Sequence, residues 1–182
     1  MRRGRRSTFL LLALVASAFA AQTVRTEAAG LRFTLPSTWT RVPTGAATRA
    51  AEYRLPPAAA DTAETEFVLL VPGDGRRDGA QETIDRWCRG FTQPDGRPSR
   101  EAATVTTRTV KNLRATAVDL AGTYVGVASG PTQAGVSGYR MLGAVIEGPG
   151  GPWYFQMLGP AASVGEAKGD FDALIRSLEP HR

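Results

Sequence analysis

The chain has 182 residues, among them 22 Lys and Arg, 17 Asp and Glu, one His and one Cys, and its formal net charge is +5. One cysteine excludes an internal disulfide, and one cysteine with one histidine excludes a transition-metal site of the usual kind within one chain. The length corresponds to about one domain, which is large enough for a hydrophobic core to stabilise the fold without cross-links.

The N-terminal stretch MRRGRRSTFLLLALVASAFAAQ has a basic start, an apolar run from Phe9 to Val15 and the exit motif Ala18-Phe19-Ala20. This pattern is typical of a secretory signal peptide, so we expect residues 1–20 to be removed by cleavage after Ala20. A retained anchor needs about 20 apolar residues, more than the stretch from Phe9 to Ala21 provides. We therefore expect an extracytoplasmic protein, periplasmic or secreted, with no transmembrane segment after signal removal.

The leader also explains the charge. It contains four arginines and no acidic residue, so the rest of the chain has a net charge of only +1. A strongly basic chain would favour nucleic acid or an anionic membrane as a partner. The balanced mature chain removes that argument, and we expect no nucleic-acid partner. Arg5 and Arg6 also occur as a pair in twin-arginine export signals, but their spacing to Phe9 favours the ordinary secretory route.

Residues 21–30 are small and polar without a period and are expected to form a flexible lead-in. A single globular α+β domain is expected over residues 31–182. Strict alternation from Leu31 to Leu35 predicts a strand with one buried face. Residues 50–55 and 66–71 predict two more strands, separated by a loop rich in proline and acidic residues.

The periodicity then changes to that of a helix. One stripe of an amphipathic helix contains Ala80, Ile84, Trp87, Cys88 and Phe91. Asp78, with Gln81 three residues later, is expected to cap the start of this helix.

The C-terminal half predicts four more strands and a helix. Two strands are expected at 103–110 and 115–127, on either side of Asn112, followed by a long mobile loop over 128–138. Residues 139–147 and 153–158 are expected to form an antiparallel hairpin over the turn GPGGP. Ser163 to Glu166 has the form of a capping box, which is expected to begin the last helix. Its apolar face contains Ala167, Phe171, Leu174, Ile175 and Leu178.

These elements predict an antiparallel sheet of about seven strands flanked by two main helices. The segments LRFTLPSTW, DRWCRGF, VDLAGTY, YRMLGAVIEGPGGPWYFQMLGP and FDALIRSL resemble a family of secreted bacterial proteins of unassigned function. The order of the elements is similar to the PsbP-like α+β fold. That resemblance implies an accessory role, because the best-known members stabilise or assemble larger complexes. It implies no catalytic residues.

Cys88 is the one thiol in the chain, and nucleophilic chemistry needs its thiolate form. The residues that share its helix face are Ile84, Asp85, Phe91 and Thr92, which are apolar, neutral or negative and oppose ionisation. We therefore interpret Cys88 as a small buried core residue, with an intermolecular disulfide and catalysis as the alternatives. The one histidine, His181, follows a helix-stopping proline near the C-terminus, a poor position for an oriented base.

Motifs for other chemistry are missing from the sequence. It contains neither Gly-x-Ser-x-Gly nor Ser-x-x-Lys, and GPGGP joins two strands, whereas a phosphate-binding loop leads into a helix. One acidic loop contains Asp61, Glu64 and Glu66, and another contains Asp74 and Asp78, but their spacing matches no calcium-binding loop. We expect no metal and no cofactor.

The remaining candidates are Tyr124, Tyr139 and Arg140, which flank a glycine-rich loop from Gly126 to Gly138. Such a loop over a sheet can gate a pocket or contact a partner, although large aromatic residues in strands usually fill the core. The leading hypothesis is an exported, non-catalytic binding or accessory protein of the bacterial envelope, whose partner is an unidentified protein or small ligand. The alternative is a hydrolase that uses carboxylates without a short motif, and a third possibility is a purely structural partner-binding module.

Overall fold

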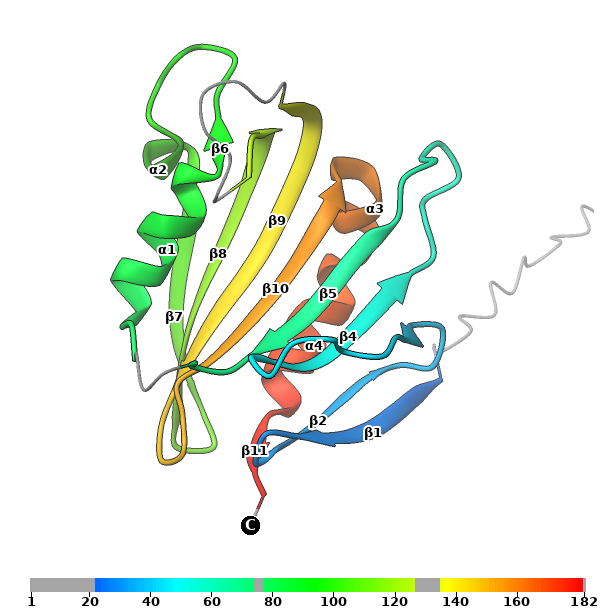
Figure 1. The fold of residues 1–182 in the computed structure, drawn as a ribbon, viewed down its shortest axis with the longest axis vertical. Helices are drawn as coiled ribbons and strands as arrows, with labels where there is room; N and C mark the ends of the chain where they lie inside the picture. Colours follow the sequence, from blue (N-terminus) through cyan, green and yellow to red (C-terminus); the bar gives the residue numbers. More distant parts are fainter. Residues whose placement is uncertain (1–21, 74–76, 127–134, 182) are drawn as a thin grey trace, which may run out of the picture.

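The computed structural model describes residues 22–73, 77–126 and 135–181 (Figure 1). The signal peptide expected over residues 1–20 lies outside the described residues, as do Asp74 and most of the loop expected over 128–138.

Within the described residues, eight strands form one antiparallel sheet in the order β3-β4-β5-β10-β9-β8-β6, and β7 also pairs with β8. The strands are β3 (Thr40–Arg41), β4 (Arg49–Leu55), β5 (Thr65–Leu70), β6 (Phe91–Thr92), β7 (Thr104–Val110), β8 (Leu113–Tyr124), β9 (Val136–Glu147) and β10 (Trp153–Pro160).

A second, three-stranded sheet joins the two ends of the chain. It consists of β1 (Thr23–Ala28), β2 (Leu31–Pro36) and β11 (Glu179–Pro180). The helices are α1 (Ala80–Arg89), α2 (Ser99–Ala102), α3 (Ala161–Glu166) and α4 (Lys168–Ser177). In Figure 1, α1 and α2 lie on one side of the large sheet, and α3 and α4 lie on the other. The predicted α+β class, with a large antiparallel sheet and two main helices, α1 and α4, is confirmed.

The two faces of the large sheet carry separate core clusters, because successive side chains of a strand point to opposite faces. On the α4 face, residues such as Ala115, Leu142 and Phe155 pack with α4 and β2. On the α1 face, the cluster contains Ile84, Trp87, Cys88, Val118, Leu120, Met141 and Tyr154. We call these the α4 core and the α1 core.

The lead-in expected over residues 21–30 needs a correction, because β1 lies within it. β1 pairs with β2 along its whole length, from Thr23 opposite Pro36 to Ala28 opposite Leu31. Its side chains are mostly exposed, so no apolar alternation marks it in the sequence. Backbone pairing, rather than burial, makes this segment a strand.

Both predicted helix caps are wrong. The N-cap of α1 is Gly79, which has no capping side chain, and the Asp78 carboxylate accepts a hydrogen bond from Arg86 instead. In the C-terminal region the helix begins at Ala161, so Ser163 lies inside α3, and α3 and α4 meet at Ala167. The Ser163 hydroxyl is buried, where it donates to Asp61 at 2.6 Å.

Two turns show how the local sequence sets the hairpins. The β7–β8 turn has positive φ at both central residues, 43° at Lys111 and 68° at Asn112, as a two-residue turn that matches the twist of the strands requires. The β9–β10 hairpin over GPGGP forms as predicted. Val136, Ser137 and Gly138 belong to β9, so this part of the expected loop is strand.

Candidate functional site

Tyr124 and Tyr139 come together on the α1 face of the sheet. Their rings stack with centroids 6.2 Å apart and an interplanar angle of 10°. Tyr124 also contacts the buried ring of Phe91, at a centroid distance of 5.2 Å. Val136 lies opposite Tyr124 in the strand register and is 50% exposed. We call Tyr124, Val136 and Tyr139 the tyrosine patch.

The Tyr124 phenol of the tyrosine patch is neutral at ordinary pH. Burial raises the pKa of the Tyr124 phenol, and the negative charge of Glu66 raises it further. A phenol of this kind offers an apolar ring together with a hydroxyl that can donate or accept a hydrogen bond. The patch is therefore suited to contacting a partner, and ionisation of Tyr124 is opposed.

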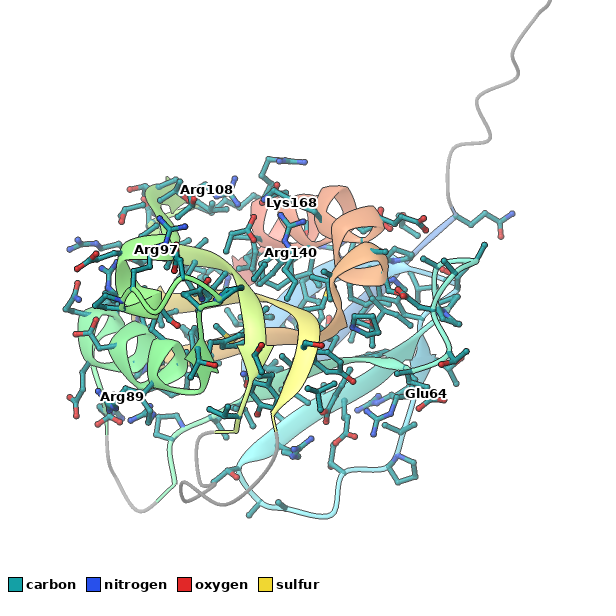
Figure 2. All side chains as sticks on the ribbon, turned by 90° about the horizontal axis from the view of Figure 1, so that it is seen from above. Glu64, Arg89, Arg97, Arg108, Arg140 and Lys168 are labelled. Atoms are coloured by element: carbon teal, nitrogen blue, oxygen red, sulfur yellow. The ribbon has the colours of Figure 1, made fainter. Side chains whose placement is uncertain are left out.

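Arg140 does not join this patch, because it lies next to Tyr139 in β9 and its side chain points to the opposite, α4 face. There its guanidinium donates two hydrogen bonds to Asp119, at 2.8 and 2.7 Å. Figure 2 shows Arg140 and Lys168 on the side of α3 and α4. The structure thus brings together two of the three candidate binding residues and separates the third.

Asp119 is the centre of an ion-pair network on that face. Burial alone would raise the pKa of Asp119, but the hydrogen bonds and charge of Arg140, together with Lys168, hold it below its usual range. The Lys168 ammonium lies 3.5 Å from both Asp119 and Asp172, and Arg108 lies 3.4 Å from Asp172. These contacts connect α4 to β7, β8 and β9. Within this network Asp119 is the partner of Arg140, so the role of Arg140 is structural.

Cys88 is 3% exposed and belongs to the α1 core, so its predicted place as a small core residue is confirmed. Burial raises the pKa of its thiol; Arg100 lowers that pKa and Asp85 raises it. The neutral thiol therefore predominates at neutral pH, which opposes nucleophilic chemistry.

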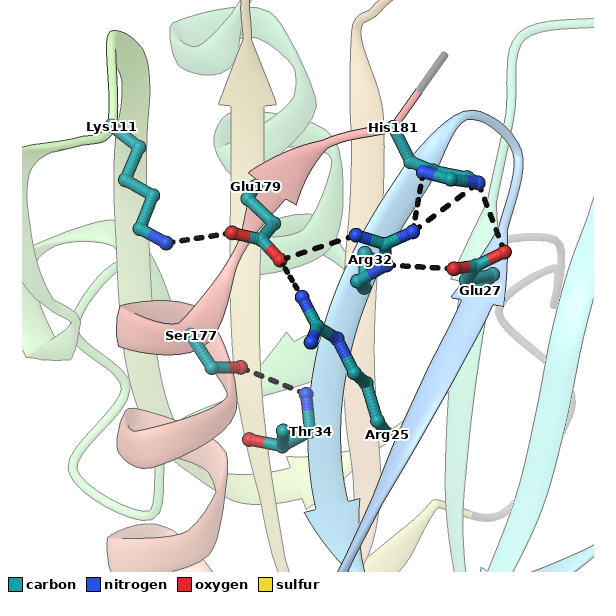
Figure 3. Close-up of polar contacts among 8 residues, drawn as sticks. All are labelled: Arg25, Glu27, Arg32, Thr34, Lys111, Ser177, Glu179 and His181. Carbon is teal, nitrogen blue, oxygen red and sulfur yellow. Dashed lines mark hydrogen bonds and ion pairs between the residues drawn. The ribbon is translucent and has the colours of Figure 1, made fainter.

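His181 is held more firmly than the sequence predicted. Its backbone N–H donates to the carbonyl of Gly30. Its Nδ1 accepts from Arg32 at 2.7 Å, and its Nε2 lies 3.1 Å from Glu27 (Figure 3). The pairing of β11 with β2 brings His181 to this position, and no local motif in the sequence marks it. The imidazole therefore helps to connect the C-terminal residues to β1 and β2.

Five carboxyl groups of the described residues have a lowered pKa because of contacts within the protein. The pKa values of Glu27, Glu52, Asp85, Asp119 and Glu179 all lie below their usual range. A glycosidase needs the opposite in one of its two carboxyl groups, a raised pKa that keeps the proton available. These five carboxyls are therefore poor candidates for the acid in the alternative hydrolase hypothesis.

The acidic residues considered for calcium have protein partners as well. Asp61 accepts hydrogen bonds from the backbone and hydroxyl of Ser163, while Glu64 pairs with Arg54 and Glu66 with Arg49. Across residues 22–73, 77–126 and 135–181, the structure has no group of three or more His, Cys, Asp or Glu side chains placed to hold a metal ion. In the same residues, each helix is too short or too polar to cross a membrane.

Comparisons with known proteins show the fold. No protein-family model and no curated protein matches the chain. Among the solved structures that match is the solution structure of the cyanobacterial PsbP protein CyanoP from Synechocystis sp. PCC 6803, with a TM-score of 0.52 and 12% identity. The match covers 93% of this chain and 99% of that one. The chain has a PsbP-like fold.

A second match is the crystal structure of PA94, a protein of unknown function from Pseudomonas aeruginosa, with a TM-score of 0.47 and 10% identity. It covers 88% of this chain and 98% of that one. The PsbP-like fold confirms the resemblance expected from the order of the elements, and at such low identity it shows the architecture alone.

Proposed function

We propose that this protein is a non-catalytic binding or accessory domain that is exported and acts in the bacterial envelope, either periplasmic or secreted. The observation that carries the proposal is the tyrosine patch, where two stacked tyrosines lie beside a half-exposed valine at the end of the β8–β9 pair. The leader sequence supports export. The PsbP-like fold supports an accessory role by analogy.

The state of the reactive side chains supports a role without catalysis. The Cys88 thiol is buried, and the His181 imidazole is held by Arg32 and Glu27. Asp119 is neutralised by Arg140. Each of these groups stabilises the fold, and each would have to leave its contacts to act on a substrate.

The tyrosine patch suits a protein partner. Tyrosine is enriched at protein interfaces because it combines a large apolar ring with a polar hydroxyl. The stacking of Tyr139 on Tyr124, and of Tyr124 against Phe91, restrains the rings before binding. Little side-chain entropy is then lost when a partner docks, which favours affinity.

Affinity capture with matched surface variants tests the patch. We expect wild-type protein to retain a specific partner from an envelope extract of its host, and the variants Val136→Ser and Tyr139→Ser to retain severalfold less. Val24→Ser is the control, because Val24 is similarly exposed, at 47%, but lies on β1. Equal retention by all variants would contradict a binding role for the patch. Turnover in a hydrolase panel that disappears in Glu66→Gln, with the fold retained, would favour the hydrolase alternative.

Export has a test of its own. We expect the protein recovered from the envelope or the medium to begin at Ala21, as measured by mass spectrometry of its N-terminal peptide. Recovery of the uncleaved chain from the cytoplasm would contradict this part of the proposal.

A further inference from the structure

A pocket of about 500 Å³ lies between α1 and α2, away from the Asp119 network. Ser99 fixes α2 to β6, the strand that follows α1: its hydroxyl donates to the carbonyl of Phe91 at 2.8 Å and accepts from Gln93 at 3.1 Å. The volume lies in the range of about 300 to 1,000 Å³ that is usual for small-molecule sites.

The inner surface of this pocket is apolar. It is formed by Cys88 and Phe91, both almost fully buried in the α1 core, together with Pro98 from the segment before α2. Because the Cys88 thiol is neutral, it acts here as a small apolar group. An apolar ligand group placed against these side chains would be removed from water, which favours binding.

The rim of the pocket is cationic. Its charged residues are Arg89, Arg100 and Asp85, so arginine is in excess. Arg100 donates a hydrogen bond to the Asp85 carboxylate at 3.0 Å, and Gln81 donates a second one to the same carboxylate at 2.8 Å. Arg89 is exposed, and Figure 2 shows it on the α1 side of the molecule, away from Arg140. The hydrogen bond from Gln81 lowers the pKa of Asp85, and the charges of Arg100 and Arg89 lower it further.

We propose that this pocket binds a small amphipathic anion, whose carboxylate or sulfonate group is held by Arg89 and Arg100 while its apolar part covers Cys88 and Phe91. The planar guanidinium of arginine matches the two oxygens of such a group and forms charge-assisted hydrogen bonds with it. The apolar lining selects against small inorganic anions, and the arginines select against neutral or cationic amphiphiles. This site goes beyond the protein-docking role of the tyrosine patch.

Fluorescence titration with anilinonaphthalene sulfonate, an aromatic sulfonate, tests the site in the full chain expressed with its leader. We expect saturable binding of one probe per chain that octanoate displaces and that octanol and octylammonium do not. Arg89→Ala and Arg100→Ala should each weaken binding about tenfold, as expected for the loss of one charge-assisted contact. Arg114→Ala is the control, because Arg114 is an exposed arginine of β8 that does not line this pocket.

One further variant separates the effect of arginine's charge from that of its planar shape, and another separates binding in this pocket from docking at the tyrosine patch. Arg89→Lys keeps the charge but loses the planar fork, so we expect an intermediate affinity. Val136→Ser, which changes an exposed side chain of the tyrosine patch that does not line the pocket, should bind the probe as wild type does, so failure of the docking proposal leaves this result unaffected. Unchanged affinity in both alanine variants, or equal displacement by octanol and octanoate, would overturn the proposal. Thermal melts show which variants remain folded, and Arg89→Ala, at an exposed position, keeps the test valid if Arg100→Ala unfolds.

Discussion

Gly143 in β9 allows α1 to approach the sheet closely. A Cβ atom at this position would lie 2.7 Å from Cε3 of Trp87, closer still to Cζ3, and 3.0 Å from a methyl group of Val118. Trp87 is buried in the α1 core and cannot move aside freely. The absence of a side chain at residue 143 is therefore a packing requirement of the α1 face.

We expect Gly143→Ala to lower the free energy of unfolding by about 1 to 3 kcal/mol, the usual cost of overpacking a core. Gly169→Ala is the matched control, because a Cβ built there meets no side chain or distant backbone atom within 4 Å. Gly169 is the second residue of α4, so this change should instead raise the free energy of unfolding, by at most the about 0.5 to 1 kcal/mol that is usual in a helix interior. Urea unfolding of both variants measures the difference, and equal effects would contradict the close contact with Trp87.

The burial of Cys88 makes a second prediction at this scale. We expect a water-soluble thiol reagent to label the native protein slowly and the denatured protein rapidly, because the thiol is buried and its pKa is raised by that burial. The measurement is the labelled fraction over time with and without denaturant. Rapid, stoichiometric labelling of the native protein would show an accessible thiol and would reopen the catalytic alternative.

At the scale of elements, β11 connects the ends of the chain through Glu179. This carboxylate pairs with Arg25 of β1, with Lys111 of the β7–β8 turn at 2.7 Å and with Arg32 of β2 at 3.7 Å (Figure 3). The hydrogen bonds of Lys111 and Arg25 lower the pKa of Glu179 to about 2. One side chain thus joins elements from three parts of the sequence.

The lowered pKa of Glu179 gives a pH dependence of defined sign. The folded state holds the ionised carboxylate, so its stabilisation is complete above the ordinary glutamate pKa of about 4.3 and is lost as pH falls toward 2. We expect thermal melts of Glu179→Gln to lack this part of the wild-type decline in acid. Glu101→Gln, at an exposed position of α2, is the control and should follow wild type. An identical acid profile for Glu179→Gln and wild type would contradict the role of the cluster.

The sequence best predicted the elements in which the spacing of apolar side chains reflects which of them are buried. The alternation in β2 and the helical stripe in α1 both mark side chains that enter a core. β1 was missed because its pairing uses the backbone, which leaves no trace in side-chain polarity. The caps were wrong because Asp78 and Ser163 bind more distant partners, Arg86 and Asp61, which local spacing cannot reveal.

The candidate site could be predicted only in part. Tyr139 and Arg140 are neighbours in a strand, and alternation alone places them on opposite faces. The stacking of Tyr124 on Tyr139 depends on the pairing of β8 with β9, where the register shifts between Gly122 and Tyr124. The pocket beside α1 depends on how α2 returns to the end of that helix, and this arrangement is tertiary.

At the scale of the whole molecule, the two cores share one sheet. Strands β8, β9 and β10 contribute side chains to the α4 core from one face and to the α1 core from the other. Loss of packing on either face removes support from strands that the other core needs. We therefore expect the described parts of the chain to unfold as one cooperative unit.

Substitutions in each core test this cooperativity. Leu174→Ala in the α4 core and Ile84→Ala in the α1 core each remove a buried aliphatic side chain, so we expect each to lower the free energy of unfolding by about 2 to 5 kcal/mol. In a background where Trp39 and Trp153 are replaced by Phe, the fluorescence of Trp87 reports the α1 core alone, and far-ultraviolet circular dichroism reports the whole sheet. The two signals should change at the same urea concentration in both variants. A Trp87 transition that precedes the circular dichroism transition in Ile84→Ala would show that α1 and its core separate from a sheet that stays folded.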